Sequence, residues 1–113
     1  ETDAGNFTVW PGTHKSHEQY FREHTPDIML QEESFRTIHH SPNVPKGEPR
    51  QITGKAGDVV IVHYLTLHTA AANIKHNIRY ACFFRVQHKD RDRDWRAPLL
   101  DMWMHWPGLQ NLT

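Results

Sequence analysis

The sequence is poor in the features of secreted, membrane-spanning and nucleic-acid-binding proteins. Cys82 is its one cysteine in 113 residues, so the chain cannot form a disulfide within itself, and a reducing compartment fits. No apolar run approaches the length of a membrane span, and no secretory signal is visible. Thirteen basic and thirteen acidic residues give a net charge of zero, which leaves nucleic-acid binding by charge unsupported. We therefore expect a cytoplasmic protein with no membrane span and no nucleic-acid partner.

The composition is that of one small folded domain. A length of 113 residues allows at most one domain and lies near the lower limit for a well-buried core. A hydrophobic share of 37%, with aromatic residues spread along the chain, argues against disorder. The chain is therefore expected to fold around a single core.

Short apolar runs separated by Gly and Pro turns predict a mainly β fold. Residues Asn6 to Trp10 alternate in character, and Pro11-Gly12 ends this strand. Val59 to Val62 is continuously β-branched, as expected for a strand covered on both faces. Ile78 to Gln87 is the clearest strand, and Arg50 to Thr53 is a short one. Several short strands of this kind indicate an all-β sandwich or jelly roll with added helices.

Helices and loops are predicted between these strands. A capping box at Ser16 and Gln19 opens a helix that runs to about His24, and Pro26 breaks it. The other predicted segments are a helix from Ile28 to Phe35, a helix from Leu99 to Trp106 that Pro107-Gly108 stops, and loops over His39–Arg50 and Thr69–Asn77.

Arg79 is the first candidate functional residue, because strand alternation places it on one face with Ala81 and Phe83. A guanidinium among apolar side chains needs a partner, since an unpaired buried charge is costly. A small dicarboxylate is one such partner, bound through two parallel hydrogen bonds. The alternative is a structural salt bridge, or an arginine at a strand edge that reaches solvent.

His68 is the second candidate, because it closes an apolar run just before a loop of alanines. Imidazole suits Fe(II), and non-haem iron oxygenases use two histidines and one carboxylate with open positions. The alternative is a hydrogen-bonded histidine of the core or its rim. The spacing from His68 to Arg79 also occurs between His39 and Arg50. Strand context separates the two cases, because only His68 and Arg79 lie at the end and the start of adjacent predicted strands.

Other reactive residues give weaker signals. His88-Lys89-Asp90 formally satisfies a His-x-Asp metal pair, but it follows His68 in a charged segment and we reject it. Without cysteine partners or a His-Glu-x-x-His helix, zinc binding is not expected. His63 lies five residues before His68, where it could line the same pocket, although a packed strand histidine is the simpler interpretation.

An ordered set of motifs adds to these local signals. The turn Pro11-Gly12-Thr13-His14-Lys15 closes one apolar run, Gly57-Asp58 opens a second, and His68 precedes Arg79 with ten intervening residues. In this order the motifs resemble the C-terminal half of the phytanoyl-CoA dioxygenase family, which are Fe(II)- and 2-oxoglutarate-dependent oxygenases. The resemblance extends over residues 4–86.

The resemblance implies a double-stranded β-helix, a cupin-like jelly roll with short flanking helices. Residues 1–113 would form the C-terminal part of this single domain. It also implies that His68 binds Fe(II) and that Arg79 binds the far carboxylate of the co-substrate 2-oxoglutarate. The reaction would use O2 to hydroxylate a small-molecule or lipid-like substrate and would release succinate and CO2. The pocket around these residues is expected to include Ala70, Ala81, Phe83 and His63.

The sequence departs from the family pattern in two places. The family's first two metal ligands, a His-x-Asp pair, are expected before the Pro-Gly-Thr-His turn, and residues 1–10 do not contain them. The family often has a hydroxyl two residues after the distal histidine, where this chain has Ala70. We therefore expect an incomplete catalytic domain with little or no turnover by itself.

Two other classes of protein remain open. A non-catalytic jelly-roll module would bind a carboxylate through Arg79 and use His68 for structure alone. A cupin-type metal protein would use more of the ten histidines as ligands. A half-barrel that exposes apolar edges is also expected to self-associate.

Overall fold

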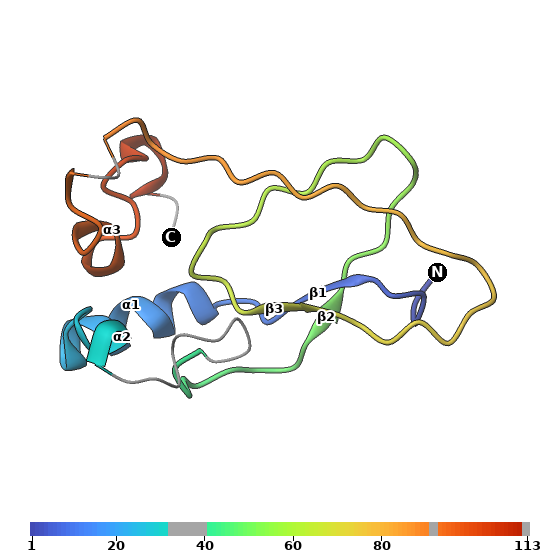
Figure 1. The fold of residues 1–113 in the computed structure, drawn as a ribbon, viewed down its shortest axis with the longest axis horizontal. Coiled ribbons are helices and arrows are strands. Elements are labelled where there is room, and N and C mark those ends of the chain that lie inside the picture. Colours follow the sequence, from blue (N-terminus) through green and yellow to red (C-terminus); the bar gives the residue numbers. More distant parts are fainter. Residues whose placement is uncertain (32–40, 91–92, 112–113) are drawn as a thin grey trace.

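Three strands of the described residues form one antiparallel sheet in the order β2-β1-β3. The computed structural model describes residues 1–31, 41–90 and 93–111. Strand β1 covers Phe7–Val9, β2 covers Arg50–Gln51 and β3 covers His68–Ala70 (Figure 1). Because β1 is central, the sheet joins segments that lie far apart in the sequence.

The pairing register decides which side chains share a face of the sheet. Phe7 lies opposite Ala70, and Val9 lies opposite His68. Since side chains alternate along a strand and directly opposed residues point the same way, these four side chains lie on one face. This face carries the candidate metal ligand.

The other face of β1 is polar and more deeply buried. Asn6 and Thr8 are buried, whereas Phe7 and Val9 are half-buried. The Thr8 hydroxyl donates a hydrogen bond to the Asn6 carbonyl at 3.2 Å, and the Asn6 amide donates to the Glu1 carbonyl at 2.8 Å. The predicted strand at Asn6–Trp10 is therefore confirmed over Phe7–Val9, but its polar side is the buried one.

Helix α1 covers Thr13–His24 and starts three residues before the predicted capping box at Ser16. Gly12 turns the chain into the helix with left-handed backbone angles, φ 83°. A side chain at residue 12 would meet nothing within 4 Å, so glycine is needed there for its conformation and not for space. The helix ends at His24 as predicted, because Pro26 follows.

The hydrophobic core lies between α1 and the C-terminal segment. Thr13, His17 and Phe21 are buried at four-residue intervals and form one stripe along α1. Phe21 packs with the buried side chains of Leu65 and Met102. Partly buried apolar side chains surround this cluster: Tyr20, Ile28, Met29, Leu99 and Trp103.

The predicted C-terminal helix over Leu99–Trp106 is wrong in its bounds. The structure has a short helix α3 over Ala97–Leu100 and a 3-10 helix η3 over Pro107–Leu109. Helix α3 ends because Asp101 takes extended backbone angles, φ −140° and ψ 90°. Pro107 begins the helical turn η3, whereas the sequence predicted that a helix would end at this residue.

Helix α2 covers Ile28–Gln31, the first part of the helix predicted over Ile28–Phe35. The rest of that prediction, and the first residues of the predicted loop His39–Arg50, lie outside the described residues. Within the described parts of the chain, none of the helices is both long and apolar enough to cross a membrane.

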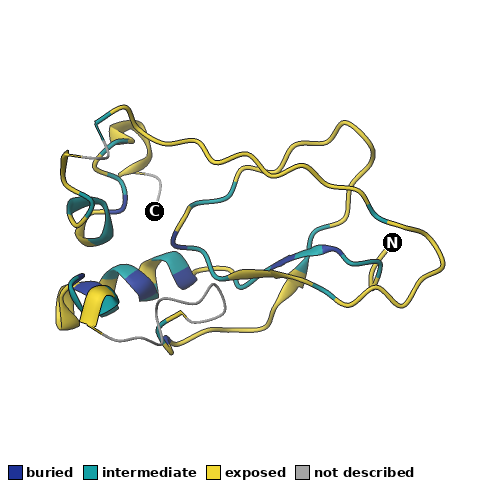
Figure 2. Ribbon diagram, viewed as in Figure 1, coloured by how far each residue is buried: buried dark blue, intermediate teal, exposed yellow. Residues whose placement is uncertain are grey.

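The two apolar segments 59–62 and 78–87 do not form strands, so both strand predictions are wrong for the described chain. Each follows an extended path, but neither pairs with β1, β2 or β3 (Figure 1). Both are exposed along almost all of their length (Figure 2), with Ile61 93% and Phe84 87% exposed. A strand needs a neighbour for its backbone groups, and the described residues supply none to these segments. A complete jelly roll is therefore not formed by the described residues.

Two boundaries also differ from prediction. His68 begins β3, where the sequence placed it at the end of an apolar strand. The predicted loop Thr69–Asn77 consequently starts inside β3. The strand predicted over Arg50–Thr53 is confirmed for Arg50–Gln51, and the Ile52 N–H beyond it still donates a hydrogen bond to the Phe7 carbonyl at 2.8 Å.

Candidate functional site

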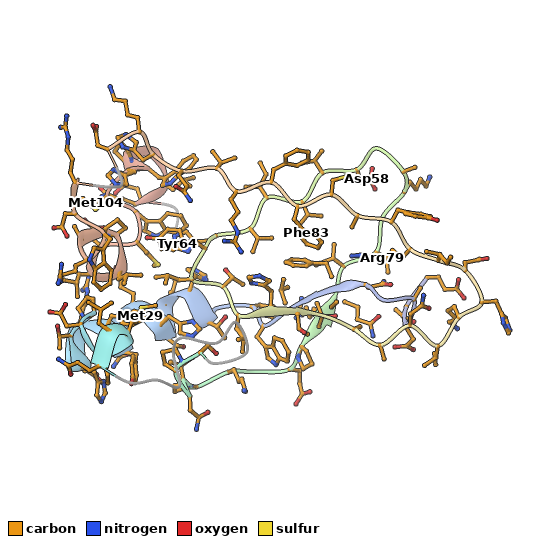
Figure 3. The ribbon with its side chains drawn as sticks, viewed as in Figure 1. Met29, Asp58, Tyr64, Arg79, Phe83 and Met104 are labelled. Carbon is orange, nitrogen blue, oxygen red and sulfur yellow. The ribbon has the colours of Figure 1, made fainter. Side chains whose placement is uncertain are left out.

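The face of the sheet that carries His68 also gathers two aromatic rings. The centroids of the His68 and Phe7 rings are 5.2 Å apart, and those of Phe7 and Phe83 are 6.1 Å apart. Phe7 on β1 thus contacts both β3 and the 78–87 segment. The contact places this segment over the His68 face of the sheet (Figure 3).

Arg79 lies on the same side of the 78–87 segment as Phe83. Figure 3 shows both side chains on the side that faces β1. Arg79 is half-buried. Among the ion pairs of residues 1–31, 41–90 and 93–111, none involves Arg79. Alternation along the segment places Ala81 on this side too.

The His68 ring is held in one tautomer. Its Nδ1 lies 2.8 Å from the carbonyl oxygen of Thr66. A carbonyl only accepts hydrogen bonds, so Nδ1 carries the proton, and in the neutral ring Nε2 then keeps its lone pair. Metal-binding histidines commonly donate their second ring N–H to a carbonyl in this way. His68 is exposed, and its contact with the Thr66 carbonyl is of this kind.

Ala70 shares the face of His68, and its methyl group offers no hydrogen bond to a ligand. Thr69 carries a hydroxyl but pairs with Thr8, so its side chain points to the opposite face. No hydroxyl is therefore supplied by the position two residues after His68 or by its neighbour.

His63 lies in a different environment from His68. Its ring contacts those of Tyr64 at 4.2 Å, Trp103 at 4.7 Å and His14 at 5.8 Å. Its Nδ1 accepts from the Leu65 N–H at 3.2 Å, and its Nε2 lies 3.1 Å from the Met102 carbonyl. These contacts tie His63 to α1 and the C-terminal segment. Within the described residues, no ring contact joins it to His68, Phe7 or Phe83.

Sequence reasoning missed Thr13 and His17, which reach from α1 to the chain just before His68. The Thr13 hydroxyl accepts from the Leu67 N–H at 2.9 Å, and His17 Nδ1 lies 2.7 Å from the Leu65 carbonyl. The four-residue spacing of Thr13, His17 and Phe21 was the signal that could have found them, because it marks a buried helix stripe.

Burial lowers the pKa of three histidines in this region. The pKa of His17 and that of His63 fall below 6.5 because both rings are withdrawn from water. Burial also lowers the pKa of His14, and the neighbouring titratable groups of His63 and Lys15 lower it further. Burial raises the pKa of the Tyr64 hydroxyl to about 12. At neutral pH the three histidines are therefore uncharged.

We expect the chain to lose stability as the pH falls below about 6.5. The unfolded chain has the ordinary histidine pKa of 6.5, while the folded pKa values of His17 and His63 are lower. The unfolded chain therefore binds more protons in this range, and stability is lost as the pH falls towards the folded pKa values. Urea unfolding at pH 7.5 and 5.5 measures the effect. His17→Asn should reduce the pH dependence, and an unchanged dependence would contradict the assignment.

The described residues contain one candidate metal ligand and not a complete set. No group of three or more His, Cys, Asp or Glu side chains in them could hold a metal ion. The rejected His88-Lys89-Asp90 motif makes local contacts: the Asp90 N–H donates to His88 Nδ1 at 3.2 Å, and the His88 ring stacks on His105 at 4.1 Å. Among the described residues, His68 therefore has no pair of neighbouring donor side chains that could complete a metal site with it.

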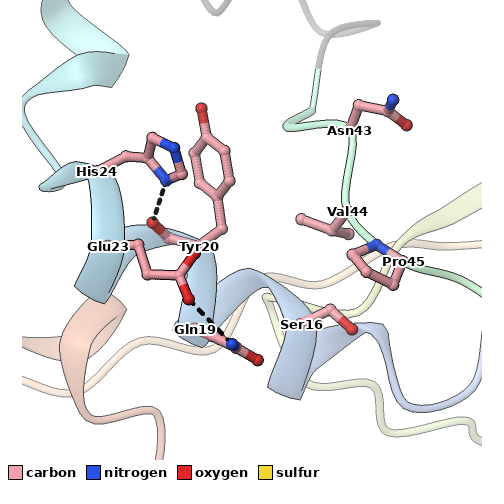
Figure 4. A pocket seen from close by; sticks show the side chains of 8 residues that line it. All are labelled: Ser16, Gln19, Tyr20, Glu23, His24, Asn43, Val44 and Pro45. Atoms are coloured by element: carbon pink, nitrogen blue, oxygen red, sulfur yellow. Dashed lines mark hydrogen bonds between the residues drawn. The ribbon is translucent and has the colours of Figure 1, made fainter.

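A surface pocket of about 490 Å³ lies on another side of α1 (Figure 4). Polar groups on its rim bond to one another: Gln19 donates to Glu23 at 2.9 Å, and His24 Nδ1 lies 3.0 Å from the Tyr20 carbonyl. None of the candidate site residues lines it. Its lining residues are Ser16, Gln19, Tyr20, Glu23, His24, Asn43, Val44 and Pro45.

His68 and Phe7 on the sheet and Phe83 on the 78–87 segment thus form one aromatic cluster, and Arg79 lies on the same side of that segment as Phe83. The model of the family Phytanoyl-CoA dioxygenase (PhyH) matches residues 1–81, and the chain belongs to that family. The matched residues include His68 and Arg79, so the predicted resemblance is confirmed. No curated protein and no solved structure matches the chain.

Proposed function

We propose that this chain is the C-terminal part of the catalytic domain of an Fe(II)- and 2-oxoglutarate-dependent dioxygenase. The reaction hydroxylates a small-molecule or lipid-like substrate. The observation that carries the proposal is the His68 ring, whose Nδ1 is held by the Thr66 carbonyl and whose Nε2 is left for a metal. Membership of the family supports it.

His68 is the proposed ligand of Fe(II) in this part of the domain. Bound Fe(II) with 2-oxoglutarate and O2 would supply the oxidising power for hydroxylation, with release of succinate and CO2. The Thr66 carbonyl keeps the ring from rotating away from the metal and maintains the basic nitrogen at Nε2. Phe7 packs against the same ring and restricts it further.

Arg79 is the proposed anchor of the far carboxylate of 2-oxoglutarate. A guanidinium fork matches a carboxylate with two parallel hydrogen bonds, and its half-buried position strengthens them. Phe83, Phe7 and Ala81 would form the apolar wall that keeps water from the site. Because Ala70 has no hydroxyl, the charge of Arg79 carries most of this recognition.

We also propose that this chain forms one half of a double-stranded β-helix. The exposed apolar segments 59–62 and 78–87 support the idea, because they would become strands once neighbouring strands covered them. The missing metal ligands would come from that other half. The 113-residue chain alone is accordingly expected to show little turnover.

An anaerobic titration with Fe(II) and 2-oxoglutarate tests the proposal. The longest natural chain that contains these residues should give the metal-to-ligand charge-transfer band of an Fe(II)–2-oxoglutarate complex. His68→Ala should abolish both the band and the retention of Fe(II), because it removes one of three ligands. His76→Ala is the matched control, since His76 is exposed, and it should leave the band intact. Iron at normal stoichiometry in His68→Ala would remove His68 from the site.

The same titration separates a second candidate function, a carboxylate-binding module without a metal. The lack of a three-donor cluster in the described residues favours it over a cupin with many histidine ligands. In that case 2-oxoglutarate would bind in an Arg79-dependent way, and neither Fe(II) nor His68 would alter its affinity.

A further inference from the structure

The three residues that precede His68 are held by an unusual set of side-chain contacts. Each backbone N–H and each carbonyl of Leu65, Thr66 and Leu67 has a hydrogen-bond partner, and four of the six partners are side-chain atoms. The four side-chain partners are His63 Nδ1 for the Leu65 N–H (3.2 Å), His17 Nδ1 for the Leu65 carbonyl (2.7 Å), His68 Nδ1 for the Thr66 carbonyl (2.8 Å) and Thr13 Oγ1 for the Leu67 N–H (2.9 Å). The two backbone partners are the His63 carbonyl for the Thr66 N–H (2.9 Å) and the Trp10 N–H for the Leu67 carbonyl (3.0 Å).

Thr13 links two segments through a single hydroxyl. Its Oγ1 donates to the Trp10 carbonyl at 2.7 Å and accepts from the Leu67 N–H at 2.9 Å. The residue is 1% exposed, so water cannot replace either bond. The left-handed turn at Gly12 places Thr13 at the start of α1, where its hydroxyl reaches both partners. Thr13 therefore sets the position of Leu67 relative to the end of β1.

His17 fixes the other end of the tripeptide. Its Nδ1 must carry a proton, because its partner at 2.7 Å is the Leu65 carbonyl. The ring is buried, and its Nε2 has no hydrogen-bond partner within the described residues. The contact to Leu65 thus ties this ring to the segment that precedes His68.

We propose that Thr13 and His17 are positioning residues for His68. They hold Leu65 and Leu67, which flank Thr66, and so set the place of the Thr66 carbonyl that binds His68 Nδ1. That bond keeps the proton on Nδ1 and leaves Nε2 free. The value of this arrangement for catalysis rests on the proposed role of His68 as a metal ligand, but the arrangement itself does not need the metal.

Matched substitutions separate this role from simple packing. Thr13→Val removes the hydroxyl and keeps the shape, while Thr13→Ser keeps the hydroxyl. His17→Leu removes the donor, while His17→Asn places an amide N–H near the position of Nδ1. Thr8→Val is the control for a lost buried hydroxyl, because Thr8 lies on the sheet face opposite His68.

The readout is the His68 ring in the metal-free 113-residue chain, observed by long-range proton–nitrogen NMR correlation. The wild-type chain should show the Nδ1–H tautomer. Thr13→Val and His17→Leu should shift His68 towards a mixture of tautomers, whereas Thr13→Ser, His17→Asn and Thr8→Val should keep the wild-type signals. If Thr13→Val and His17→Leu both fold and both give wild-type His68 signals, the proposal is overturned.

Failure to fold does not remove the test. If Thr13→Val unfolds the chain, His17→Leu takes its place, and the reverse also holds. If both unfold, Thr13→Ser and His17→Asn decide, because altered His68 signals in either would overturn the proposal and unaltered signals in both would support it. Because the readout needs no metal, a failure of Fe(II) binding would contradict the proposed function and leave this positioning role standing.

Discussion

Replacing Arg79 with alanine is expected to weaken 2-oxoglutarate binding by about 2–5 kcal/mol, a roughly 30- to 5,000-fold rise in Kd. The reason is that the far carboxylate would lose its charged partner in a half-buried position. Ala70 provides no hydroxyl that could compensate. Anaerobic calorimetry on the Fe(II)-loaded protein measures the change.

Arg85→Ala is the matched control for this prediction. Arg85 lies on the same segment and shares the alternation of Arg79, but it is exposed and lies six residues further along. The Arg85→Ala substitution removes the same charge as Arg79→Ala and should change the binding free energy of 2-oxoglutarate by less than about 1 kcal/mol. Equal losses in the two variants would mean that general charge, and not an anchor at Arg79, attracts the co-substrate.

The second large effect is on folding: Phe21→Ala is expected to lower the free energy of unfolding by about 3–5 kcal/mol. Phe21 is 3% exposed and joins α1 to Leu65 and Met102 in the one buried apolar cluster of the described residues. Small domains have only about 5–15 kcal/mol of net stability, so this change removes much of it. Urea unfolding followed by circular dichroism measures the loss.

Leu30→Ala provides the comparison for Phe21→Ala. Leu30 lies on α2 and is 58% exposed, so its truncation should cost less than about 1 kcal/mol. Similar losses for the two variants would show that the cluster around Phe21 is not the main source of stability.

Local signals in the sequence were enough to predict β1 and most of α1. Pro11-Gly12 ends β1, and Pro26 ends α1, because these residues act through their own backbone angles. The start of α1 was missed because Gly12 makes the turn by its backbone conformation, without a capping side chain. A capping box three residues later gave a stronger but misleading signal.

The apolar segments 59–62 and 78–87 show where sequence patterns fail. Their β-branched and aromatic composition predicts strands, but both segments are extended without pairing to β1, β2 or β3. A strand also needs a neighbour, and no property of these residues supplies one. The patterns therefore describe what these segments can form with a partner and not what they form among the described residues.

The candidate site was predictable in part. His68 and Arg79 stand out through motif order, and the family match includes both. Thr13 and His17 were missed because their partners are 54 and 48 residues away in the sequence. The His68 contact to the Thr66 carbonyl is local, but the proposed positioning of Thr66 by Thr13 and His17 depends on these distant contacts.

The long separation between paired segments has a consequence for the order of folding during synthesis. Helix α1 completes its packing only when the Glu18 side chain meets the backbone of Met102, 84 residues later. At a translation rate of roughly 5–20 residues per second, α1 would wait about 4–17 s for this contact. Contacts of this kind are slow to form because a long loop must close first. During synthesis, β1 can therefore pair with β2 and β3 before α1 completes its packing against the C-terminal segment.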